Sequence, residues 1–289
     1  MNRLQVILNG EFVPEERAVV SVFDRSFLYG DGLYEAIPIV DGRPFRWAEH
    51  LDRFANGAAL LKIRCPFSDE AMRRFADELV AQNKLPDALL RITLSRGVGQ
   101  RGYSPKGADT PTLVMNLHPL PPPDAGVVKR WRLITASQRL PAGEPLAQFK
   151  NANKLPQILA RAEADEAGAN EALLQNSEGW VVEGTTSNLF WIKGSTVNTP
   201  PLVAGILPGV TRAVVQDICR SMGIEFRELN IKIDELNRTD GVFLSMSSLG
   251  VVVAESLDDV QLPEPPLVSQ IHRAYCNLLR QEQPQELEG

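Results

Sequence analysis

A proline-rich segment in the middle of the chain constrains its fold more than any other feature. Four prolines lie within residues 119–126 (PLPPPDAG). Proline lacks a backbone N–H and fixes φ at about −65°, so this segment cannot continue a helix or a central strand. We therefore expect a smaller domain at residues 1–118, a linker at residues 119–128 and a larger domain at residues 129–289, an organisation that 289 residues can support.

Hydrophobic periodicity predicts helices and strands on both sides of this segment. Strands are expected at 4–8, 12–13, 34–40, 88–95, 112–117, 132–136, 171–174, 189–192, 226–229, 242–245 and 251–254. Helices are expected at 47–62, from Ser68 onward, and at 155–167, 209–222 and 267–280. Asn9-Gly10 predicts a hairpin turn, and Ser68 is a good N-cap. Strands and helices in no strict alternation predict an α+β architecture of two domains.

Composition and charge argue against several classes of protein. A net charge of -6 gives no broad positive surface for nucleic acid. No apolar stretch is long enough for a membrane span, and no signal-peptide core follows Met1, so a cytoplasmic location is expected. Cys65, Cys219 and Cys276 are too few and too scattered for a disulfide framework, and the three histidines are unclustered, so no metal site is expected.

Lys150 lies in the segment 149–155 (FKNANKL), directly before a run predicted to be helical. A lysine that forms a Schiff base must lose its proton near neutral pH, which requires partial burial or a cationic neighbour. Its place between Leu146–Phe149 and the helix suits partial burial. Lys154 is the alternative nucleophile, and residue chemistry alone does not choose between the two.

A carboxylate and a glycine-containing helix start follow Lys150 along the chain. Glu183, in the segment 182–190 (VEGTTSNLF), could keep a pyridine nitrogen protonated and so strengthen the ring as an electron sink. The segment 205–212 (GILPGVTR) places a turn before a helix, whose free N–H groups and dipole favour a phosphate. The order of lysine, carboxylate and phosphate cradle predicts a pyridoxal 5'-phosphate (PLP) site.

With Arg53 upstream and Ser247-Ser248 downstream, this order resembles the class IV aminotransferase family, also called PLP fold type IV, from about residue 9 to about residue 257. The resemblance implies PLP as cofactor, a small-molecule substrate and a homodimer. It favours Lys150 over Lys154 as the catalytic lysine, because the family lysine is followed closely by Asn and a helix. The aromatic residue that some aminotransferases carry shortly after this lysine is missing here. The implied cofactor-binding residues are Arg53, Glu183, Asn188, Leu207, Val210, Thr211, Ser247 and Ser248.

Two reactions of the family fit the remaining motifs. The segment 95–105 (SRGVGQRGYSP) resembles a loop of aminodeoxychorismate lyases, in which Arg96 and Arg101 would bind the two carboxylates of the substrate, beside Tyr103. Against this, the run after Tyr34 lacks the Glu-Thr-x-Arg of many lyases. Tyr34 itself resembles a substrate-contacting residue of D-amino-acid aminotransferases, and Arg96 could equally bind a single α-carboxylate.

The leading prediction is 4-amino-4-deoxychorismate lyase, which forms 4-aminobenzoate and pyruvate for folate synthesis. The alternative is an amino-acid aminotransferase of the branched-chain or D-amino-acid type that uses a 2-oxo acid acceptor. A minor alternative is a PLP-binding protein without catalytic activity.

Overall fold

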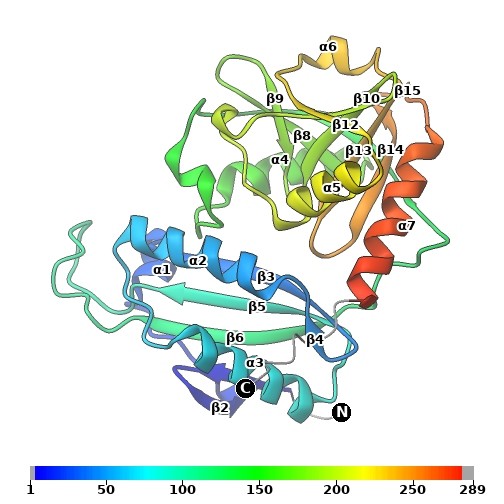
Figure 1. Cartoon of the computed structure of the whole chain (residues 1–289). Helices are drawn as coiled ribbons and strands as arrows, with labels where there is room; N and C mark the ends of the chain where they lie inside the picture. Colours follow the sequence, from blue (N-terminus) through cyan, green and yellow to red (C-terminus); the bar gives the residue numbers. More distant parts are fainter. Residues whose placement is uncertain (1–3, 282–289) are drawn as a thin grey trace.

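Two β-sheets with flanking helices make up the protein, whose computed structural model describes residues 4–281 (Figure 1). The first sheet uses residues from 5 to 119, and the second uses residues from 129 to 261. Residues 120–128, which connect the two sheets, contain no helix or strand. Their prolines account for this, because they remove backbone donors that regular structure needs. No helix of the described chain has the length and apolar character needed to cross a membrane.

The first sheet is antiparallel throughout, with strand order β2-β1-β6-β5-β3-β4. Its strands are β1 (Gln5–Leu8), β2 (Glu11–Pro14), β3 (Gly32–Val40), β4 (Arg43–Pro44), β5 (Ala88–Ser95) and β6 (Thr112–Pro119). Its helices are α1 (Arg25–Tyr29), α2 (Trp47–Leu61) and α3 (Asp69–Asn83). Asn9 and Gly10 have φ of 53° and 86°, as the predicted hairpin turn requires. Ser68 caps α3 as predicted, because its side chain accepts a hydrogen bond from Ala71 N.

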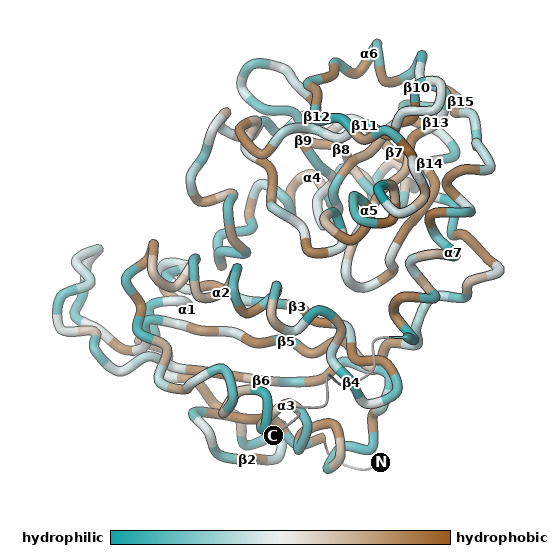
Figure 2. Tube along the Cα trace, viewed as in Figure 1, coloured by the Kyte–Doolittle hydropathy of each residue, from teal (hydrophilic) through white to brown (hydrophobic). Residues whose placement is uncertain are grey.

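Helices α2 and α3 lie side by side on one face of this sheet, because the buried residues of both helices share one core cluster with the inward-facing residues of β3, β5 and β6 (Figure 1). Figure 2 shows polar and apolar residues alternating along both helices, as expected for helices with one buried face. Phe149, from the other half of the chain, enters the core of the first sheet beside Gly57. A Cβ added at Gly57 would lie only 2.7 Å from the Phe149 ring. This close contact anchors the chain directly before Lys150.

The second sheet closes part of itself into a ring. Its strands are β7 (Lys129–Leu140), β8 (Glu171–Asn176), β9 (Val181–Gly184), β10 (Asn188–Lys193), β11 (Thr196–Thr199), β12 (Glu225–Glu228), β13 (Gly241–Met246), β14 (Gly250–Leu257) and β15 (Val260–Gln261). The path runs β12-β11-β10-β13-β14-β7-β8-β9, and β9 also pairs with β10 through Glu183 and Asn188. The closing pair therefore brings two predicted site residues side by side.

Four helices accompany the second sheet: α4 (Leu155–Glu166), α5 (Val210–Ser221), α6 (Ile233–Leu236) and α7 (Pro266–Gln281). Helix α7 also contacts the residue that follows β4, because the Tyr275 ring meets the Phe45 ring edge to face at 5.8 Å. The predicted helices and strands are confirmed with small differences in length, the largest at β7, which extends to Leu140. The sequence did not predict α1, α6, β4, β9, β11 or β15, because elements this short show too few periods of a hydrophobic pattern.

Candidate active site

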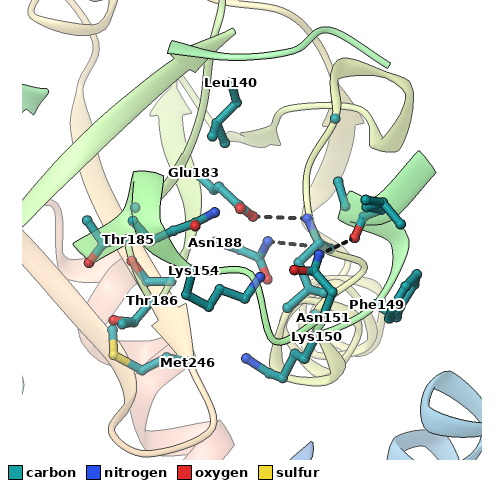
Figure 3. Close-up of a pocket in the computed structure, with 18 of the residues that line it drawn as sticks. Leu140, Phe149, Lys150, Asn151, Lys154, Glu183, Thr185, Thr186, Asn188 and Met246 are labelled. Carbon is teal, nitrogen blue, oxygen red and sulfur yellow. Dashed lines mark hydrogen bonds between the residues drawn. The ribbon is translucent and has the colours of Figure 1, made fainter. Parts of the chain in front are cut away.

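A pocket of about 290 Å³ lies between the two sheets (Figure 3). Tyr34 and Arg53 reach it from the first sheet and α2, and its other lining residues come from the chain after residue 139. The predicted site residues that line it are Tyr34, Arg53, Lys150, Glu183, Asn188, Leu207, Val210, Thr211 and Ser247. Ser248 follows Ser247 in the same turn but is not part of the lining. The pocket therefore gathers most of the groups predicted to bind the cofactor.

The backbone around Lys150 is held by hydrogen bonds to the first residues of β3. Tyr34 N donates to Lys150 O at 2.8 Å, and Ala152 N donates to Gly32 O at 2.9 Å. Lys150 Nζ has no hydrogen-bond or salt-bridge partner among residues 4–281 and lies 5.5 Å from the centre of the Tyr34 ring. Burial, helped by the positive charge of Arg53, lowers the pKa of the Lys150 amine to about 8. The amine is therefore suited to act as a nucleophile near neutral pH.

The pH dependence of cofactor capture should follow this pKa. We expect the rate at which the apo-protein reacts with PLP to rise with pH through about 8, rather than through the ordinary lysine value of 10.5. Below this pKa the amine is protonated and not nucleophilic, and above it the amine is neutral. The charges of Arg53 and Lys154 favour the neutral amine, whereas those of Glu35 and Glu183 oppose it. Stopped-flow absorbance across a pH series measures the midpoint, and a midpoint near the ordinary value would contradict the prediction.

Arg53 is fixed by a carboxylate that the sequence analysis did not single out. Its Nε and Nη2 donate to Glu35 Oε1 and Oε2, both at 2.7 Å, and its Nη1 donates to Pro208 O at 2.9 Å. His50 Nδ1 lies 2.8 Å from Glu35 Oε2. Burial alone would raise the pKa of Glu35, but Arg53 and His50 outweigh it and lower the pKa to about 2. Glu35 is thus a stable anion that holds Arg53 against the turn before α5.

Glu183 and Asn188 together hold the backbone of Leu207. Leu207 N donates to Glu183 Oε2 at 2.9 Å, and Asn188 Nδ2 donates to Leu207 O at 2.9 Å. Figure 3 shows these bonds at the pocket wall opposite Lys150. Burial raises the pKa of Glu183, so a cationic ligand group facing it would stabilise its charged form.

A second buried glutamate supports the turn that follows Glu183. Glu171 is fully buried and accepts hydrogen bonds from the backbone N–H groups of Thr185 and Thr186, at 3.1 and 3.2 Å. The Thr186 hydroxyl also donates to Glu171, at 3.0 Å. The turn is thus fixed in position at the pocket wall. Sequence reasoning missed Glu171, since nothing in its own segment marks it as polar support for residues more than ten positions away.

The phosphate-binding prediction has a structural counterpart at the start of α5. Gly209 is the N-cap residue, and the first helical residues Val210 and Thr211 line the pocket. On the neighbouring strand β13, Ser245 Oγ lines the same pocket, is buried and has no partner among residues 4–281. An unpaired buried hydroxyl is costly, so a polar ligand at this position is expected. With the Lys150 amine and the Glu183 carboxylate, these groups fit PLP.

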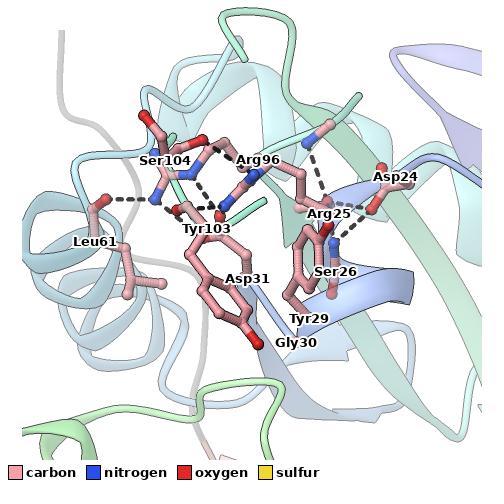
Figure 4. A network of polar contacts seen from close by, with 12 residues as sticks. Asp24, Arg25, Ser26, Tyr29, Gly30, Asp31, Leu61, Arg96, Tyr103 and Ser104 are labelled. Carbon is pink, nitrogen blue, oxygen red and sulfur yellow. Dashed lines mark hydrogen bonds and ion pairs between the residues drawn. The ribbon is translucent and has the colours of Figure 1, made fainter. Parts of the chain in front are cut away.

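Arg96, predicted to bind substrate, is engaged elsewhere (Figure 4). It is buried, and its guanidinium makes an ion pair with Asp31, with Nε–Oδ2 and Nη2–Oδ1 distances of 2.8 and 3.0 Å. It also donates to Leu61 O at 2.7 Å and Lys62 O at 3.2 Å, which satisfies the end of α2. Arg96 does not line the pocket of this chain.

Arg25 fixes the rest of the loop that Arg96 begins. It pairs with Asp31 and donates to three loop carbonyls, those of Gly102, Tyr103 and Ser104, at 2.9, 3.0 and 3.2 Å. Arg101 and Tyr103 themselves are exposed, with 87% of Tyr103 accessible, and neither lines this chain's pocket. Both side chains are therefore accessible to another molecule, although the Tyr103 ring packs edge-on against Tyr29 at 5.5 Å.

Comparisons with known proteins agree with this geometry. A sequence profile of the family described as Amino-transferase class IV matches residues 32–257. A Methanocaldococcus jannaschii protein provisionally named a branched-chain-amino-acid aminotransferase is 37% identical over 88% of each chain. An aminodeoxychorismate lyase of Bacillus subtilis is 28% identical, again over 88% of each chain. The T.th. branched-chain amino acid aminotransferase, solved with pyridoxamine 5'-phosphate, superposes with a TM-score of 0.91 at 27% identity, covering 98% of this chain and 96% of that one.

Proposed function

The chain belongs to the class IV aminotransferase family, and from that premise we propose that it transfers the amino group of an amino acid with one carboxylate to a 2-oxo acid. Family membership confirms the predicted α+β PLP fold type IV, the dependence on PLP and the assignment as an enzyme. The amino-acid substrate and the reaction are the parts we propose. The cytoplasmic location expected from the sequence stays a prediction.

The position of Arg96 carries the choice of reaction. The lyase prediction used two arginines of one loop for the two carboxylates of aminodeoxychorismate. The guanidinium of Arg96, however, donates its hydrogen bonds to Asp31 and to the carbonyl groups at the end of α2. Arg101 is then the one arginine of that segment left for a carboxylate. A second carboxylate would have no arginine of this loop as its partner, and so would lose about 1.5–3 kcal/mol of the charge-assisted hydrogen bonding that the lyase prediction assigned to Arg96. A substrate with a single carboxylate fits this loop better.

The side chains have separate tasks in this reaction. PLP, when bound, supplies a ring that withdraws the negative charge developing on the substrate α-carbon. Glu183 would keep the ring nitrogen protonated, while Ser247 and the N–H groups at the start of α5 would hold the phosphate. Lys150 Nζ, in its neutral form, would take the proton from the α-carbon of the substrate and deliver it to the cofactor.

A homodimer is part of the proposal. Val22, Phe23 and Phe27 form an exposed apolar run, with 63, 64 and 73% of their surfaces accessible. An apolar surface of this kind suits a protein interface. Arg101 and Tyr103 are exposed and do not line the pocket of their own chain, so they are available to the pocket of a second copy.

Aminodeoxychorismate lyase is the second candidate. The sequence of residues 95–105 supports it, and so does the 28% identical B. subtilis lyase. This reaction would release pyruvate and 4-aminobenzoate and would need no 2-oxo acid. The two candidates therefore differ in a product that can be measured directly.

Product analysis separates the two reactions. We expect the purified enzyme with PLP to consume a 2-oxo acid and an amino acid in equal amounts and to release no 4-aminobenzoate from aminodeoxychorismate. Arg101→Ala should raise KM for the amino acid about tenfold or more, because a charge-assisted hydrogen bond contributes about 1.5–3 kcal/mol. The exposed Arg74→Ala is the matched control. Release of pyruvate and 4-aminobenzoate together, with no 2-oxo acid consumed, would overturn the proposed aminotransferase activity and support the lyase activity.

A further inference from the structure

A second lysine lies in the pocket beside Lys150. Lys154 is the N-cap residue of α4 and makes no side-chain cap bond. Its side chain lines the pocket, and Figure 3 shows it between Glu183 and Lys150. Among the residues that the structure describes, its Nζ has no hydrogen-bond or salt-bridge partner.

This position is unfavourable for an unpaired cation. The N-terminus of a helix carries partial positive charge, which repels an ammonium group. Burial lowers the pKa of Lys154, and the attraction of Glu183 opposes that shift only in part. Glu183 itself is engaged by Leu207 N at 2.9 Å. A ligand that brings an anionic oxygen to Lys154 would offset these costs.

We propose that Lys154 binds an anionic oxygen of the ligand. This oxygen is the deprotonated 3-hydroxyl group on the ring of PLP. In PLP the aldehyde carbon and the ring nitrogen lie at opposite ends of the ring, the ends assigned here to Lys150 and Glu183. Of the two remaining edges, one carries the phosphate arm and the other the ring hydroxyl. The N–H groups at the start of α5 are assigned to the phosphate. Lys154 would therefore face the edge of the ring that carries the hydroxyl group.

The same cation could instead hold a substrate carboxylate, which is the other source of an anionic oxygen. The inference rests on the proposed placement of PLP between Lys150 and Glu183. It does not depend on whether the enzyme is an aminotransferase or a lyase, because both reactions would use the same cofactor oxygen.

Titration of the apo-protein with PLP and with its 3-O-methyl ether tests the proposal without any turnover. The ether keeps the aldehyde and the phosphate but cannot form the ring oxyanion. We expect Lys154→Met to weaken PLP binding about tenfold, the loss typical of one charge-assisted hydrogen bond, and to leave binding of the ether almost unchanged. Lys154→Arg should retain most of the PLP affinity. Lys129→Met, an exposed lysine on β7, is the control and should bind both compounds as the wild type does.

The outcomes separate the two sources of the oxygen. Normal PLP affinity in Lys154→Met together with a raised KM for the amino acid would assign Lys154 to the substrate carboxylate and overturn the cofactor assignment. Unchanged values for both would overturn the role of Lys154 altogether. Equal losses for PLP and its ether, or equal losses in the Met and Arg variants, would show a packing effect and would also overturn it. Circular dichroism of each variant verifies folding, and a borohydride-trapped adduct on Lys150 tests the placement of PLP separately.

Discussion

Lys150→Ala is expected to abolish the covalent adduct with PLP and to reduce turnover by at least about 10³-fold, within the range that a positioned proton-transfer group contributes. The side chain combines an amine whose pKa is lowered to about 8 with a backbone fixed to β3 by two hydrogen bonds. Alanine removes the nucleophile but leaves Glu183 and the start of α5 in place. The variant should therefore still bind PLP, without a covalent link.

Mass spectrometry of the borohydride-reduced protein measures this result. The wild-type protein should carry the reduced cofactor on Lys150, and Lys154→Met should carry it there too when PLP is saturating. An adduct on Lys154 in the wild type would show that the two lysines have been assigned in the wrong order.

The regular elements could be predicted because their patterns are local. α2 and α3 each bury one face. Ser68 caps α3 by accepting a hydrogen bond from Ala71 N, only three residues further along the chain. β9 could not be predicted from four residues, yet its pairing with β10 sets Glu183 opposite Asn188. The closing of the second sheet depends on contacts between distant strands, which no local pattern reports.

The same limit applies to the site. Lys150, Glu183 and the start of α5 were predicted from an order of motifs, and the structure places them around one pocket. The support for Arg53 was missed, although His50 and Arg53 are three residues apart on α2, a spacing that puts both on one helix face. Their shared partner Glu35 lies on another element, so only the fold reveals the cluster.

Arg96 has contacts that its motif does not report. Its sequence context predicted a substrate contact, but its partner Asp31 lies 65 positions earlier and Leu61 lies 35 positions earlier. An arginine with such partners is buried by the fold, and local sequence carries no sign of it. Arg25, in the unpredicted helix α1, was missed for the same reason.

Glu183→Gln is expected to keep PLP bound and to slow turnover by on the order of 10²-fold or more, comparable to the loss of one pre-positioned electrostatic group. Glutamine has the same shape, and its Oε1 can still accept the hydrogen bond from Leu207 N. It carries no negative charge, so it cannot keep the ring nitrogen protonated, and the ring becomes a weaker electron sink. The loss should therefore appear in kcat rather than in cofactor affinity.

Rates at saturating PLP, measured beside a PLP titration of the apo-protein, separate these effects. Glu178→Gln is the matched control, because Glu178 is exposed on the turn between β8 and β9 and should behave as the wild type. Full activity in Glu183→Gln would exclude a charge at the ring nitrogen as its role. Loss of PLP binding with an unchanged kcat at saturation would instead make Glu183 a structural partner of Leu207. Burial raises the pKa of Glu183, so its carboxylate gains most from a cation that faces it. A protonated ring nitrogen is such a cation, and the uncharged side chain of Gln would not stabilise it.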